Sequence, residues 1–158
     1  MFDILLYLYD TYLFSEHFPA PEQLSRKLSA AGFEAADIGA ALNWLAALDE
    51  LAPEETADGV PAIRCYSDAE CSRLATEGRG FLTFLEASGL LAAHAREWVI
   101  EQAMALEDPE VSGDRIKWIA LLALWKLNGA GDVLWLEDLV RGTGEFDGEG
   151  GGWQPTLH

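Results

Sequence analysis

His94 and Glu97 are the two residues whose types and spacing come nearest to a catalytic pair. They lie three positions apart, so on a helix both side chains would share one surface, where the carboxylate could orient the imidazole as a general base. The same spacing is far more common in an exposed ion pair. The sequence also contains no GxGxxG, GxxxxGK(S/T), HExxH or GxSxG motif. We therefore expect a protein that is not an enzyme and binds no cofactor.

The two cysteines, Cys65 and Cys71, offer thiol chemistry but no metal site. Five residues separate them, no second cysteine pair exists, and the histidines His17, His94 and His158 are scattered. Zinc sites use four ligands at paired, closer spacings. We expect each thiol to pack as a small apolar side chain in a reducing compartment, and a redox switch is the alternative.

Charge excludes more functions than any motif does. The chain of 158 residues has 10 basic and 27 acidic residues, a formal net charge of −17. Residues 1–60 alone hold 2 basic and 11 acidic side chains, so the excess is spread along the chain. Nucleic acid and anionic membrane surfaces would be repelled on average. The expected partner is a protein with a basic or apolar surface, and the sequence indicates no oligomeric state.

The N-terminal stretch MFDILLYLYDTYLF is apolar but does not resemble an export signal. It has no basic segment and no small-residue cleavage site, and Asp3 and Asp10 interrupt it. At roughly 14 residues it is shorter than the about 20 that a helix needs to cross a bilayer. We expect a cytoplasmic protein with no membrane segment.

Apolar residues recur at helical spacing through most of the chain, which predicts a mainly α protein built as a multi-helix bundle. Ser67 and Glu70 have the spacing of a capping box and predict a helix start near Asp68. A short strand or hairpin is expected near residues 60–66. The other expected helices span residues 2–14, 22–31, 34–51, 80–88, 93–106, 113–127 and 133–140.

Three parts are expected: an N-terminal subdomain (1–66), a C-terminal helical subdomain (67–141) and a flexible Gly-rich acidic tail (142–158). The first part is compatible with a winged helix, a fold that commonly places its last helix in the DNA major groove. That helix, 34–51, contains no Lys or Arg, although phosphate contacts supply most nonspecific affinity. Direct binding to nucleic acid is therefore not expected.

The helix at 113–127 carries the candidate interaction surface. Trp118, Leu122 and Trp125 follow one another at spacings of four and three residues, on the side opposite a first apolar face. A helix that is apolar all round is usually the buried centre of a bundle. The alternative is an exposed apolar patch, in which Trp is favoured as a binding hot spot.

Several segments, in order, resemble the bacterial Smg protein family. They are the opening MFDILLYLYDTYL, the middle CYSDAECSRLATEGRGFLTFLEASGLL, the pair REWVIEQAMAL and IKWIALLALW, and the ending TLH. The resemblance implies a cytoplasmic protein with no assigned reaction, cofactor or catalytic residue. It also implies a genomic setting near DNA-processing and topoisomerase genes. A glycine-rich insertion before the C-terminal residues departs from the family pattern.

These observations favour a noncatalytic interaction or adaptor protein. The alternative is a nucleic-acid-associated protein of winged-helix type, acting within a DNA-processing or regulatory complex. The charge balance ranks the first above the second, because a polyanion needs cations to anchor it.

Overall fold

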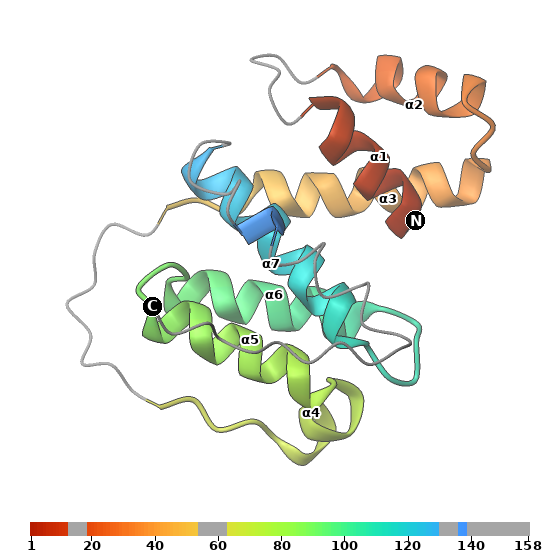
Figure 1. Cartoon of the computed structure of the whole chain (residues 1–158). Helices are drawn as coiled ribbons and strands as arrows, with labels where there is room; N and C mark the ends of the chain where they lie inside the picture. Colours follow the sequence, from red (N-terminus) through yellow and green to blue (C-terminus); the bar gives the residue numbers. More distant parts are fainter. Residues whose placement is uncertain (13–18, 54–62, 130–135, 139–158) are drawn as a thin grey trace, which may run out of the picture.

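The structure, a computed structural model, describes residues 1–12, 19–53, 63–129 and 136–138, and these are mainly helical (Figure 1). Residues 136–138 are helical as well. The predicted mainly α class is therefore confirmed, while the tail at 142–158 lies outside the described residues. The helices are α1 (Phe2–Tyr12), α2 (Pro21–Ala30), α3 (Ala35–Asp49), α4 (Asp68–Arg73), α5 (Thr76–Ala87), α6 (Ala93–Ala105) and α7 (Gly113–Asn128).

Helix α7 lies at the centre of the bundle. It packs against α3, α5 and α6 (Figure 1). It also meets α1 through aromatic side chains. Its buried side chains face every direction, from Ile116 and Leu122 to the charged Lys117. Contacts thus cross the predicted division at residue 66, which itself stays a prediction.

Local signals in the sequence explain where several helices begin and end. Ser67 accepts a hydrogen bond from the Glu70 amide, and the Glu70 carboxylate accepts one from the Ser67 amide, so the predicted capping box is confirmed. Ser112 caps α7, which ends at Gly129 with a φ of 79°.

The prediction of a short strand or hairpin near residues 60–66 is wrong for residues 63–66, the part of this segment that the structure describes. Residues 63–66 form neither helix nor strand, and the only β contact in the described ranges is an isolated parallel bridge between Leu74 and Val111. The segment is held by the side chain of Arg64, which bonds to carboxylates of α4 and α6, and not by a ladder of main-chain bonds. The winged-helix detail therefore has no support.

A candidate binding groove between α3 and α6

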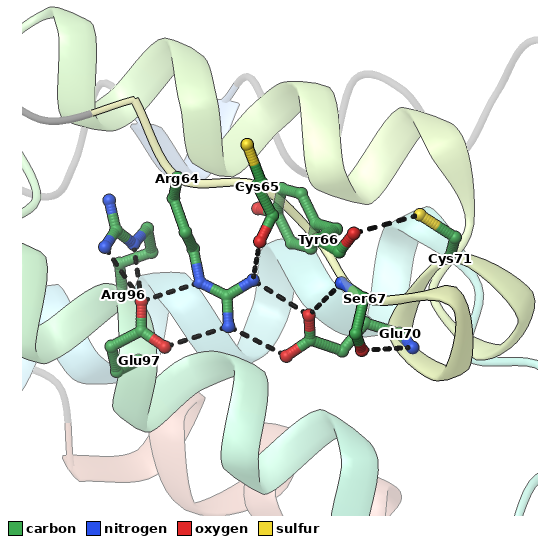
Figure 2. Close-up of polar contacts among 8 residues, drawn as sticks. All are labelled: Arg64, Cys65, Tyr66, Ser67, Glu70, Cys71, Arg96 and Glu97. Carbon is green, nitrogen blue, oxygen red and sulfur yellow. Dashed lines mark hydrogen bonds and ion pairs between the residues drawn. The ribbon is translucent and has the colours of Figure 1, made fainter.

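Arg64 stands at the centre of an ion-pair network that joins the segment before α4 to α6 (Figure 2). Its guanidinium donates two bonds to Glu70, at 2.9 and 2.7 Å, and two to Glu97, at 2.7 and 3.0 Å. Arg96, buried on α6, donates to Glu97 and Glu86. Two cations thus meet three carboxylates, and neither guanidinium is left to bind an anion.

The network shifts the pKa of its members in the directions that ion pairing requires. Hydrogen bonds from Arg64 hold the pKa of Glu70 at about 2, helped by the Ser67 amide and opposed by burial. The same guanidinium lowers the pKa of Glu97. Hydrogen bonds to Glu70 and Glu97 raise the pKa of Arg64. All these groups are charged at neutral pH.

Most other basic side chains are also bonded within the protein. Arg73 donates to three main-chain carbonyls at the end of α6. Ion pairs join Arg115 to Asp108, Lys117 to Glu77 and Lys126 to Asp49. In the described ranges only the exposed Arg26 has no bonded partner. The surface left to meet a partner is therefore acidic.

A groove runs between α3 and α6. It consists of two adjoining pockets, of about 530 and 230 Å³, that share Ala47 and Gln102. The larger pocket is the acidic end, lined among others by Glu50, His94, Glu97 and Glu101. The smaller pocket has mostly small or uncharged side chains, among them Ala40, Asn43 and Ala105.

Two tryptophans form the wall of this groove. Trp44 of α3 and Trp98 of α6 pack edge to face with ring centroids 5.4 Å apart. Trp44 lines the smaller pocket and is only 6 % exposed, and its indole Nε1 has no acceptor within the described part of the chain. A buried N–H without an acceptor is costly and rare in proteins.

The structure directs His94 and Glu97 to different partners. The His94 Nε2 lies 3.0 Å from the carbonyl oxygen of Ala52, while Glu97 is bonded to Arg64 and Arg96. Both residues line the acidic pocket. Their shared helix face was predicted correctly, but the geometry gives them no base-and-orienter arrangement.

The predicted surface of Trp118, Leu122 and Trp125 has an internal role. Leu122 is buried, and both tryptophans are half-buried against the core. The ring of Tyr9 meets Trp118 and Trp125 edge to face, at 5.7 and 5.9 Å between centroids. These contacts attach α1 to α7. A role of the three residues in binding a partner stays a prediction.

The expectation that both cysteines pack as apolar side chains is wrong. Cys65 and Cys71 are exposed. The thiol of Cys71 accepts a hydrogen bond from Arg79 at 3.2 Å, and Cys71 belongs to the short helix α4, which has no buried residue. A helix of six residues offers too little surface to bury its side chains.

Two further features concern membranes and metals. No helix in the described ranges is long and apolar enough to span a bilayer. Among the same residues, no three His, Cys, Asp or Glu side chains gather in a way that could hold a metal ion.

Sequence reasoning singled out His94 and Glu97 in the acidic pocket but missed the groove itself. The groove depends on how α3 and α6 pack, which no local pattern reveals. One signal was available: α3 carries the small residues Gly39, Ala40 and Asn43 on its exposed side, and such side chains allow close approach.

Comparison with known proteins identifies relatives over the full chain. Residues 1–145 match the model of the family described as "Protein of unknown function (DUF494)". The chain is 45 % identical to a Protein Smg homolog of Azoarcus sp. and 40 % identical to one of Methylobacillus flagellatus, and in both comparisons all of each chain is covered. A Protein Smg homolog of Bordetella pertussis is 44 % identical over 91 % of this chain and 97 % of its own. No solved structure gives a significant match. The resemblance noted in the sequence is thereby confirmed, and the chain belongs to the DUF494 family of Smg homologues.

Proposed function

We propose that this protein is a noncatalytic adaptor that acts in the cytoplasm and binds a partner protein through the acidic groove between α3 and α6. One observation carries the proposal. Nearly all described cations are bonded within the protein, whereas Glu50 and Glu101 of the groove take part in no ion pair within the described ranges. Free charge of one sign beside a hollow favours a ligand of the opposite sign.

The composition supports the same proposal. A net charge of −17 raises the encounter rate with basic proteins and disfavours nucleic acid. Long-range attraction brings basic proteins to the acidic surface. Short-range contacts within the groove can then select a partner whose shape fits.

Affinity capture from cell extract at low and high ionic strength tests this function. The immobilised full chain should retain a basic protein at low salt and release it at high salt, because screening weakens exposed ion pairs. The double variant Glu50→Lys, Glu101→Lys should retain less of it. Glu107→Lys, Glu110→Lys makes the same charge change at exposed positions outside the groove and should retain it fully. Equal capture by all three proteins, or no salt-sensitive capture by the unaltered chain, would contradict the proposal.

A further inference from the structure

Resting on that proposed function, we infer that the groove receives one α-helix of the partner, lying lengthwise between α3 and α6. The partner helix presents small apolar side chains to the Ala40 end. It presents Lys or Arg to the end lined by Glu50 and Glu101. This assigns the chemical class of the partner segment, and it rests on the shape, the lining and the charge of the groove.

The length of the groove fits a short helix. Ala40 and Ala105 line one end, while Glu50 and His94 line the other, so α3 and α6 run antiparallel along the groove. Ala40 and Glu50, the C-cap of α3, are ten positions apart, a distance of about 15 Å at 1.5 Å per residue. A partner helix of about three turns covers that distance. A segment that binds by adding a strand would need a sheet edge, and the described ranges contain no strand.

Small side chains along the groove permit a helix to approach closely. Ala40 is exposed, Ala47 is half-buried and Ala105 is exposed, so no large side chain at these three positions fills the space. Helices pack at axial distances of about 8–10 Å, and the shorter values require small residues at the contact. Asn43 and Gln102 add polar groups that can bond to a helix surface.

Charge determines which part of the occupant lies at the end lined by Glu50 and Glu101. Glu97 is already neutralised by Arg64 and Arg96, but Glu50 and Glu101 are exposed and carry uncompensated charge in the described part of the structure. Glu50 also follows the C-terminus of α3, where the helix dipole adds negative potential. A cation at this end of the occupant is attracted by Glu50, by Glu101 and by the C-terminus of α3.

The ring of Trp44 offers the occupant an aromatic surface at the Ala40 end of the groove. Its Nε1 lacks an acceptor among the described residues, and its ring lines the pocket at the Ala40 end. An occupant of that pocket would lie against the ring, so the indole signal of Trp44 can report on binding.

A peptide titration of the full ¹⁵N-labelled chain tests the inference. The probe is a capped 14-residue helical peptide of Ala and Leu with four lysines in one half. The control peptide has four glutamates in place of the lysines. The lysine peptide should shift amide signals of α3 and α6 and the indole signals of Trp44 and Trp98. Glu50→Gln, Glu101→Gln should weaken its binding roughly 3- to 30-fold, the effect of losing two exposed ion pairs.

Two matched controls separate the groove from general charge and general stability. Glu107→Gln, Glu110→Gln changes the same charge elsewhere and should leave the binding unchanged. Ala40→Trp fills the groove at an exposed position and should abolish binding, whereas Ala46→Trp, at an exposed position of the same helix that does not line the groove, should not.

The inference is wrong if both peptides bind equally, if the shifts lie outside α3 and α6, or if the lysine peptide does not bind at millimolar concentration and low salt. If Ala40→Trp captures a cellular protein as well as the unaltered chain does, and the capture is salt-sensitive, the helix-in-groove inference is wrong. The adaptor function would then still stand. Absence of any such capture would overturn the function itself.

Discussion

Arg64 forms a bidentate ion pair with Glu97, with Nε 2.7 Å from one carboxylate oxygen and Nη2 3.0 Å from the other (Figure 2). The pair joins residues that are 33 positions apart, the segment before α4 and the middle of α6. Because Glu97 also lines the acidic pocket, the pair has a second effect: it neutralises one of the three glutamates there. The charge available to a partner is thus that of Glu50 and Glu101.

Stability should depend on pH through Glu70. Its pKa in the folded protein is about 2, below the ordinary value of 4.5, so folding favours the charged carboxylate. The stabilisation is complete above about pH 4.5 and is lost as the pH falls toward 2. Glu70→Gln keeps a capping-box residue type but removes the charge, and should cost about 1–3 kcal/mol at pH 6.

Urea unfolding of both proteins between pH 2 and pH 6 measures this effect. The difference in unfolding free energy between the unaltered chain and Glu70→Gln should shrink steadily below pH 4.5. A difference that stays constant over this range would show that the Arg64–Glu70 bond does not stabilise the fold through its charge.

Gly78 lets α5 and α7 pack in contact. A β-carbon added at Gly78 would lie 2.3 Å from Cδ1 and 2.9 Å from Cβ of Ile116. Gly78→Ala should therefore destabilise the protein by roughly 1–3 kcal/mol, although Ala is the better helix former. Gly80→Ala on the same helix meets nothing within 4 Å and should be neutral or stabilising by up to about 1 kcal/mol. Thermal unfolding of both variants checks this, and equal effects would contradict the packing.

The same glycines show which parts of the fold sequence patterns could predict. Helices with marked apolar faces and both ends described, such as α6 and α7, were predicted within two residues of their ends. The start of α5 was predicted at residue 80 and lies at Thr76, because Gly78 looks like a helix breaker until its contact with Ile116 is known. Arg64 was missed for a similar reason, since its two carboxylate partners are brought together only by the tertiary fold.

Arg73 should stabilise the C-terminus of α6. Its guanidinium donates to the main-chain carbonyls of Met104, Leu106 and Asp108 at 2.7, 2.5 and 2.8 Å, groups that have no helical partner. Arg73→Lys retains the charge but loses the planar array of donors, and should cost roughly 1–3 kcal/mol. Arg26→Lys, at the exposed unpaired arginine, is the matched control and should cost nothing measurable. Equal unfolding free energies for the two variants would contradict this role.

Double-stranded DNA should not bind to the purified chain at low ionic strength. The helix α3 contains no Lys or Arg, and the cations of the described ranges are almost all bonded internally. Phosphate binding would have to break those ion pairs before it released counterions. Fluorescence anisotropy of a labelled duplex in 20–50 mM salt measures this. Tight binding that weakens with Ala40→Glu or another acid on α3 would contradict the prediction and favour a nucleic-acid role.

Trp118 and Trp125 should contribute to stability more than to partner binding. Both rings contact Tyr9, so Trp118→Ala should remove packing between α1 and α7 and cost about 2–4 kcal/mol. The conservative variant Trp125→Leu should cost less and remain folded for binding assays. Under conditions where each variant is folded, affinity for the lysine peptide should equal that of the unaltered chain. A variant of unchanged stability that no longer captures the partner would contradict this prediction and favour a binding surface on Trp118, Leu122 and Trp125.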